Sequence, residues 1–276
     1  ETRSTFHETG SESVECEAHV LALFQNGDEP QRLILDQSPF YPEGGGQIGD
    51  VGLIRGESGS FQVIGTQKSG AIVVHQGHAS GPLEVGDKVT CSVDAQARQS
   101  TRAHHTATHL LHAALRQVLG DHVTQQGSYV GPDRLRFDFS NPTGVSAEDL
   151  ARVERMVNDA VAKGSAVTTT IEDPEEAKAR GVMALFSEKY GERVRVVAVG
   201  DDSIELCGGT HVESSGQIGT FVIQQERAIQ AGVRRIEAIV GGAAIEYLQE
   251  QRRSLETAAR ALKVPPAELP ERIASL

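Results

Sequence analysis

Residues 94–120 have the sequence DAQARQSTRAHHTATHLLHAALRQVLG, and the chain changes there from strand-like to helical patterning. Leu111, Leu115 and Val118 recur at the spacing of one face of an α-helix. Asp94 is a residue type that caps helix N-termini, and Gly120 is one that ends helices. This stretch therefore predicts a helix from about 95 to 119.

The region before this helix consists of short runs rich in β-forming side chains, with no helical pattern between them. These runs are 14–24, 32–36, 61–66, 71–75 and 88–93. Closely spaced strands of this kind are typical of a small barrel or sandwich. We expect a first domain over residues 1–94 that forms a small β-barrel.

A glycine-rich segment interrupts these strands. It contains Gly44, Gly45 and Gly46, and seven glycines occur between positions 44 and 59. Glycine clusters often serve only to reach positive φ, so a simple turn is one interpretation. The other is that the backbone approaches a ligand closely, because no side chain keeps the ligand away.

The region after the helix predicts an α+β domain over residues 95–241. A second helix follows the capping sequence at Ser146 and ends at Gly164, and a short third helix begins at Asp173. Strands are predicted at 135–139, 194–199, 203–206, 220–224 and 234–240. Helices mixed with segregated strands place the whole chain in the α+β class.

Residues 242–276 predict a long helix that ends at Pro265. Ile245, Leu248 and Leu255 keep a coiled-coil rhythm, so the helix either packs on its own domain or forms a coiled-coil arm. The chain begins with Glu1 and not with Met, which suggests a piece of a longer protein.

Composition restricts the class of protein. The 276 residues carry a formal charge of −12, which opposes indiscriminate binding to nucleic acid and requires a local basic patch for any such partner. The three cysteines are too few and too scattered for a disulfide framework, so we expect a cytoplasmic protein. No run is apolar enough for a membrane helix, and we expect neither a membrane partner nor an oligomer.

Histidines and one cysteine predict a metal site. His105 and His109 are four residues apart, so both imidazoles project from one helix face, and Cys207 and His211 follow a predicted strand. Two such pairs suit tetrahedral zinc. Four protein ligands would close the site and make it structural, whereas catalysis needs an open position, and the sequence leaves both possibilities open.

Arginines form two candidate basic patches. Arg98, Arg102 and Arg116 lie on the first helix, and three more lie at 227, 234 and 235. Residues 95–120 contain no acidic side chain, and neither do residues 227–235. The arginines are either solvated surface residues or a rim that contacts phosphates.

Five motifs together resemble the editing region of alanyl-tRNA synthetases. They are Pro39–Asp50 with its glycines, His105–His112, Gln125–Val130, Cys207–Val212 and Gly232–Glu237. Pro42 and Gly44 depart from the alanine and serine common in the family's glycine motif. The resemblance covers most of the chain and includes the start of the synthetase C-terminal region, although free-standing editing proteins are close relatives.

The resemblance implies a function and a set of site residues. In that family the domain hydrolyses serine or glycine wrongly esterified to tRNA(Ala), with Zn²⁺ as cofactor. The implied ligands are His105, His109, Cys207 and His211, with Thr108 and Gln125 in the amino-acid pocket. We also expect Gly44, Gly45 and Gly46, and Arg234 and Arg235, to contact substrate or tRNA.

Two alternative functions remain at this stage, and one alternative role for Thr108. The chain can be a structural zinc module that binds tRNA without chemistry, or a zinc amidase or peptidase. A peptidase of the HExxH type needs a glutamate beside the first histidine, and Thr106 occupies that position. For Thr108, the alternative to a pocket role is a hydrogen bond back to a carbonyl one turn earlier.

Overall fold

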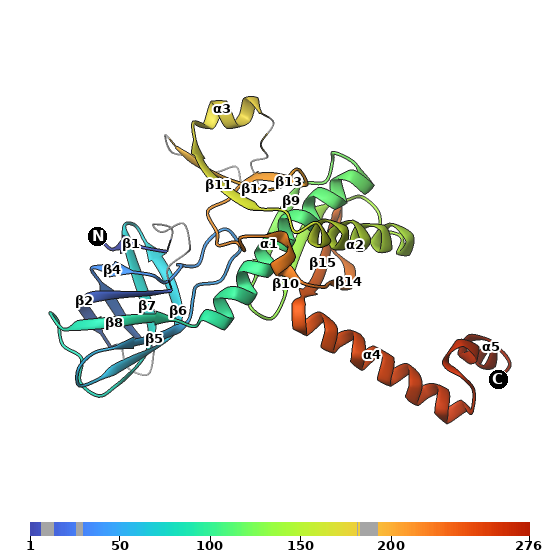
Figure 1. Cartoon of the computed structure of the whole chain (residues 1–276), viewed down its shortest axis with the longest axis horizontal. Coiled ribbons are helices and arrows are strands. Elements are labelled where there is room, and N and C mark those ends of the chain that lie inside the picture. Colours follow the sequence, from blue (N-terminus) through green and yellow to red (C-terminus); the bar gives the residue numbers. More distant parts are fainter. Residues whose placement is uncertain (7–13, 26–29, 181, 183–192) are drawn as a thin grey trace.

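The computed structural model describes residues 1–6, 14–25, 30–180, 182 and 193–276. Figure 1 shows a barrel at the N-terminal end, a mixed α/β region in the middle and a helical arm at the C-terminal end. The predicted α+β class is confirmed. No helix within the described ranges is both long and apolar enough to cross a membrane.

The N-terminal part is a closed six-stranded barrel with the strand order β2-β3-β7-β6-β5-β8. The ring closes because β2 pairs with β8, so that Glu15 lies opposite Ser92. The strands are β2 Glu15–Phe24, β3 Gln31–Leu35, β5 Gly52–Arg55, β6 Ser60–Ser69, β7 Ile72–Ser80 and β8 Lys88–Val93. Leu33, Ile54 and Phe61 are fully buried in its core. The short β1 Arg3–Ser4 and β4 Gln37–Ser38 pair in parallel beside it.

The helix α1, Ala95–Leu119, has the predicted limits. The Asp94 side chain accepts hydrogen bonds from the backbone N–H groups of Gln96 and Ala97, and Gly120 follows the last turn with a φ of 116°. Arg98, near the start of α1, is 2% exposed and bonds to the Asp50 carboxylate and the Pro39 carbonyl of the barrel segment. Arg98 therefore fits neither of the two interpretations left open by the sequence, a solvated surface residue or part of a phosphate-binding rim.

The middle region contains a four-stranded antiparallel sheet with the order β14-β15-β10-β9. Its strands are β9 Gln125–Val130, β10 Leu135–Ser140, β14 Phe221–Gln230 and β15 Val233–Val240. The helices α1 and α2, Ala147–Ala162, contribute to the same core as this sheet. Ser146 caps α2 as predicted, because its hydroxyl accepts from the Asp149 N–H.

A second, three-stranded sheet has the order β11-β12-β13. Its strands are β11 Val167–Glu172, β12 Val194–Val199 and β13 Ser203–Leu206. The short helix α3, Pro174–Ala179, follows β11, and Asp173 caps it as expected. A turn of 3-10 helix, η1 Ser215–Ile218, follows the loop that leaves β13. The sequence patterns missed β5, β9 and β11, and also the two-residue strands β1 and β4.

The C-terminal arm begins with α4, Gly241–Leu262, and continues with η2 Pro266–Glu268 and α5 Leu269–Ala274. Figure 1 shows α4 projecting away from the sheets. Among the residues of α4, Ala244 and Ala259 are the buried ones, and Ala244 packs with Val222 and Ile239. The predicted long helix is confirmed. Ala244 in its first turn packs against the sheet, and α4 also contacts η2 and α5.

Candidate metal centre and cavity

Four predicted ligands from distant parts of the sequence meet at one point. The ligand atoms of His105, His109, Cys207 and His211 all lie within 4.8 Å of one another. His105 and His109 are one turn apart on α1, with ring planes 5° apart and centroids separated by 5.3 Å. Cys207 comes directly after β13, and the loop that follows brings His211 back to α1. This group of residues, here called the cluster, could hold a metal ion.

Each imidazole of the cluster is held at its Nδ1 atom by a different side chain. The Nδ1 of His105 lies 2.7 Å from Gln47 Oε1, that of His211 lies 3.2 Å from Thr106 Oγ1, and that of His109 bonds to Glu205. The Nε2 atoms of His105 and His211 lie 3.4 and 3.3 Å from Cys207 Sγ. His109 Nε2 is buried without a hydrogen-bond partner among the described residues. Three nitrogens and one sulfur that face one another in this way fit a tetrahedral metal.

The charges of the cluster agree with this donor set. Burial alone raises the pKa of the Cys207 thiol, but the three imidazoles around it hold that pKa well below its usual value. Burial opposes charge on Glu205 as well, yet His109 lowers the pKa of that carboxyl to about 2. Although burial lowers the pKa of His109, Glu205 and Cys207 raise it to about 10. The surroundings therefore favour a cysteine thiolate, the form that binds metals.

Glu205 is the functional residue that the sequence analysis missed. It is 1% exposed, and it accepts hydrogen bonds from His109 and, at 2.8 Å, from Nδ1 of His112. It lies two residues before Cys207. The sequence did contain a signal for Glu205, because alternate residues of a strand share a face. A glutamate two positions before the candidate ligand Cys207 is therefore expected to point to the same side as the ligand. A carboxylate therefore lies beside the cluster, although Thr106 occupies the glutamate position of a zinc peptidase.

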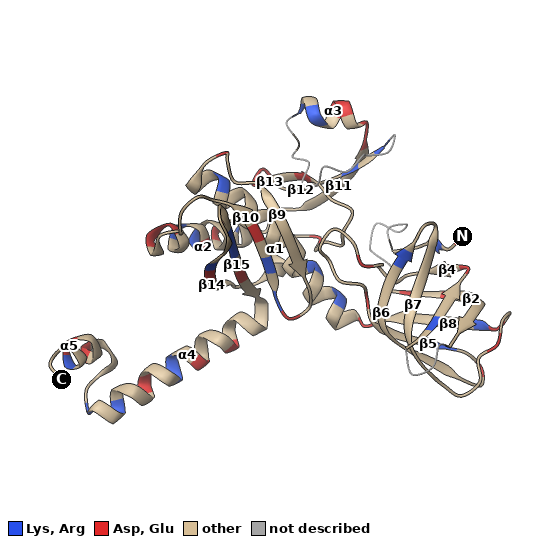
Figure 2. Cartoon of the chain, turned by 180° about the vertical axis from the view of Figure 1, so that it is seen from behind, with Lys and Arg blue, Asp and Glu red and all other residues tan. Residues whose placement is uncertain are grey.

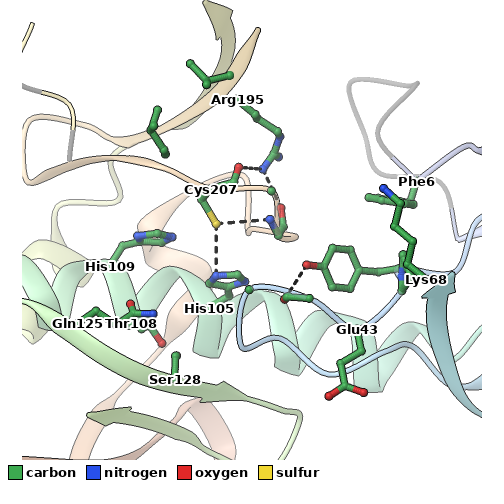
Figure 3. A pocket seen from close by; sticks show the side chains of 18 of the residues that line it. Phe6, Glu43, Lys68, His105, Thr108, His109, Gln125, Ser128, Arg195 and Cys207 are labelled. Atoms are coloured by element: carbon green, nitrogen blue, oxygen red, sulfur yellow. Dashed lines mark hydrogen bonds between the residues drawn. The ribbon is translucent and has the colours of Figure 1, made fainter. Parts of the chain in front are cut away.

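A cavity of about 440 Å³ opens beside the cluster. Figure 3 shows His105, His109 and Cys207 on its wall, with Thr108, Gln125 and Ser128 below them. The Thr108 hydroxyl donates to the His104 carbonyl at 2.9 Å, which is the back-bonded alternative, and Thr108 is also one of the residues that line the cavity. Gln125 Nε2 is buried with no hydrogen-bond partner in the described part of the chain. Thr108 thus offers an acceptor and Gln125 a donor.

The three glycines predicted to contact the substrate, Gly44 to Gly46, do not all lie at the cavity. Gly44 and Gly45 line the cavity, whereas Gly46, at φ 84°, lies so close to β9 that an added Cβ would be 2.8 Å from Ser128 Cβ. Gly209, between Cys207 and His211, has even less room, since a Cβ there would lie 2.1 Å from the His105 ring. The loop after β13 therefore depends on glycine for its approach to α1.

The predicted basic patches are largely paired. Arg234 forms a two-point ion pair with Glu226 at 2.5 and 2.9 Å, and Arg235 forms one with Asp138 at 2.6 and 2.7 Å. Figure 2 shows the blue and red segments of β14, β15 and β10 side by side. Arg116 pairs with Asp121, and Arg102 donates to the His211 carbonyl. The predicted contact of Arg234 and Arg235 with tRNA must therefore compete with these ion pairs.

Comparison with known proteins finds two matching families and several similar ligases. Residues 1–97 match the family described as tRNA synthetases class II (A), and residues 194–237 match the threonyl and alanyl tRNA synthetase second additional domain. The alanine–tRNA ligase of Acidithiobacillus ferridurans is 51% identical over 96% of this chain and 32% of its own length. That of Parvibaculum lavamentivorans is 48% identical over 97% of the chain and 32% of its own length.

A third relative, the alanine–tRNA ligase of Shewanella amazonensis, is 49% identical over 92% of the chain and 30% of its own length. The chain thus spans about a third of the length of the curated relatives it matches, at 30 to 32%. The second additional domain lies within the aligned part and includes Cys207 and His211. The chain therefore belongs to the alanyl-tRNA synthetase family and corresponds to a region of the ligase that includes this second additional domain.

Proposed function

We propose that this chain removes wrongly attached serine or glycine from tRNA(Ala) by hydrolysing the ester bond, as the proofreading region of a cytoplasmic alanyl-tRNA synthetase. The observation that carries the proposal is the cavity, which is lined by three of the four cluster residues. A purely structural zinc site is closed by its ligands, whereas a reactive one must be reached by substrate. A cavity at His105, His109 and Cys207 supports the second case.

The chemistry asked of the site is modest. A synthetase pocket that accepts alanine excludes glycine and serine poorly, so a second, hydrolytic site is needed. The aminoacyl ester is already activated, and positioning lowers much of the remaining barrier. A Zn²⁺ ion held by the cluster would supply Lewis-acid chemistry at the ester.

Thr108 and Gln125 are the residues that we propose to bind the amino acid. The Thr108 hydroxyl already donates to His104, so its oxygen is free to accept a hydrogen bond from the hydroxyl of a serine ester. The buried, unpaired Gln125 Nε2 would donate to an oxygen of the same substrate. An alanine ester offers a methyl group in place of that hydroxyl, which leaves a polar group unpaired.

The acceptor end of the tRNA requires cations near the cavity, because the chain as a whole carries a charge of −12. Lys68 of β6 and Arg193, just before β12, line the cavity and are exposed. Lys68 has no ion-pair partner among the residues described, and Arg193 donates to the Ile171 carbonyl at 2.8 Å. We assign the terminal phosphates to these two side chains, with Gly44 and Gly45 offering an unobstructed backbone.

The alternatives predict different behaviour. A structural zinc module would bind tRNA without hydrolysis, and a free-standing editor would act without the rest of a ligase. The relatives reported above are ligases, which favours a ligase region, and we propose that residues 1–94, 95–241 and 242–276 are its barrel, editing and C-terminal parts.

The test is the release of serine from Ser-tRNA(Ala) and of glycine from Gly-tRNA(Ala), with Ala-tRNA(Ala) as the control. We expect release of serine and glycine well above the buffer rate while Ala-tRNA remains intact. Binding of tRNA without any deacylation above buffer would support the structural module instead.

A further inference from the structure

Gln47, which the motif analysis did not single out as a site residue, lies where the barrel segment meets the cluster. It is fully buried, and its backbone N–H and carbonyl both bond to Gly44 at 3.0 Å. The next residue, Ile48, donates to the Val130 carbonyl of β9 at 3.0 Å. The backbone of Gln47 is therefore fixed on two sides before its side chain reaches the cluster.

The contacts of the Gln47 amide identify its oxygen and its nitrogen. The Thr210 backbone N–H can only donate, and it lies 2.9 Å from the atom assigned as Oε1. The other end of the amide, Nε2, lies 2.9 Å from the Thr210 hydroxyl oxygen. An amide turned by 180° would set an N–H₂ group against a backbone N–H, so the orientation is determined by the loop.

This orientation also determines the proton on His105. Gln47 Oε1 is an acceptor only and lies 2.7 Å from His105 Nδ1, so Nδ1 must carry the hydrogen. The Nε2 atom of a neutral His105 is then left with its lone pair, and it lies 3.4 Å from Cys207 Sγ. That is the tautomer in which Nε2 can bind a metal.

The space around this contact is already filled. A Cβ on Gly209 would lie 2.1 Å from His105 Cε1 and 2.8 Å from Gln47 Oε1. The imidazole, the amide and the loop thus pack without room for an intervening group. A direct contact of this kind cannot be replaced by a water molecule without moving the loop.

We propose that Gln47 is a positioning residue of the metal site, which holds His105 in the Nδ1–H tautomer and aims its Nε2 at the ion. The barrel is then a part of the metal site and not only its neighbour. The inference rests on the metal-binding part of the proposed function and does not depend on the substrate. Partners of this type typically change metal affinity by about 10- to 100-fold.

The first experiment compares the zinc affinity of Gln47→Leu, Gln47→Glu and the parent by competition with a chelator. Gln47→Leu removes the acceptor, and its affinity should fall by about 10- to 100-fold. Gln47→Glu keeps an acceptor for His105, and its affinity should stay close to that of the parent and well above that of Gln47→Leu. Gln62→Leu is the matched control, because the exposed Gln62 of β6 donates to the Gly52 carbonyl of the neighbouring strand β5 and is not among the residues bonded to the cluster.

Equal zinc affinities of Gln47→Leu and the parent, or equal losses in the Leu and Glu variants, would overturn the inference. The second experiment needs no Gln47 variant, so it remains decisive if Gln47→Leu does not fold. In ¹⁵N NMR spectra of the parent, with His105 assigned by its loss in His105→Asn, the metal-free protein should show the Nδ1–H tautomer. An Nε2–H tautomer there would also overturn it, whereas zinc binding without hydrolysis would overturn only the proposed reaction.

Discussion

The cavity has two contrasting parts, which differ in how far their polar atoms are already bonded. In the cluster, the Nδ1 atoms of the three histidines are each held by a partner, from Gln47, Thr106 and Glu205. The atom of the cluster without a partner among the described residues is His109 Nε2, which lies with the other candidate ligand atoms. At the wall formed by Thr108 and Gln125, here called the substrate wall, the Thr108 hydroxyl donates to His104, but Gln125 Nε2 has no partner within the described residues.

This contrast indicates a division of work. Side chains with fixed partners present a preformed donor set, because their orientation does not depend on what binds. An unpaired buried donor is costly unless a ligand satisfies it, so the substrate wall is arranged for an oxygen-rich occupant. Changes in the cluster should therefore alter metal content, and changes in the substrate wall should alter selectivity alone.

The largest effect is expected from Cys207→Ala, which removes the thiolate of the cluster. We expect the parent to hold about one zinc per chain and the variant to lose most of it, together with the hydrolysis of Ser-tRNA. Elemental analysis of protein purified without added metal measures this. Cys16→Ala, on β2 of the barrel, is the control and should retain its zinc.

A parent protein with almost no zinc and full activity would contradict the assignment of a metal to the cluster. It would also remove the division of work between the cluster and the substrate wall, because the hydrogen-bonded imidazoles would then not serve to bind a metal.

Glu205→Gln should have the next largest effect. The amide keeps the shape of the side chain, but it cannot accept hydrogen bonds at both ends from His109 and His112. We expect zinc affinity to fall by about 10- to 100-fold, measured by chelator competition. Glu213→Gln, beyond the loop and exposed, should leave the affinity unchanged.

Thr108→Val tests the substrate wall with zinc retained. Valine keeps the shape and removes the acceptor for a serine hydroxyl, a loss of about 1–2 kcal/mol or roughly 5- to 30-fold in rate. Hydrolysis of Ser-tRNA should fall towards that of Ala-tRNA by this factor, while zinc content stays at the parent level. An unchanged ratio of the two rates would move discrimination to Gln125 or to the backbone at Gly44 and Gly45.

The smallest effects are expected for Arg234→Ala and Arg235→Ala, whose charges are paired with Glu226 and Asp138. The slope of the logarithm of the tRNA-binding constant against the logarithm of the salt concentration should change by less than about 0.9, the value for one phosphate contact. Lys68→Ala and Arg193→Ala should each lower the slope by about that amount. The reverse ranking would place the tRNA on the β10-β15 sheet.

The parts of the site that sequence predicted are those encoded by local spacing. His105 and His109 share a face because a helical turn has 3.6 residues, and Asp94 and Gly120 gave the limits of that helix. Cys207 and His211 are likewise neighbours in sequence. Their meeting with α1 was predicted because the two pairs together make a tetrahedral zinc donor set, which the resemblance also implied, and the structure brings all four together.

The remaining features depend on pairings that local patterns do not contain. Gln47 and Glu205 meet their histidines across 58 and 96 residues of sequence. Arg235 lies directly opposite Asp138 in the β10–β15 register, so a count of charges along β15 alone could not show its partner. The strand β9 was missed because its polar residues, Gln-Gln-Gly-Ser, lack the alternation of a half-buried strand.

The single continuous helix α1 has a consequence for unfolding. Near its start, Arg98 is buried against Asp50 of the barrel segment, and further along Leu111 and Leu115 belong to the core shared with α2. Separating the two parts would break the hydrogen bonds of Arg98 to Asp50 and to the Pro39 carbonyl and would expose the surface that now buries them. The barrel and the sheet region should therefore melt in one cooperative transition, and a fragment that begins at Ala95 should lose thermal stability although it keeps every residue of the cluster.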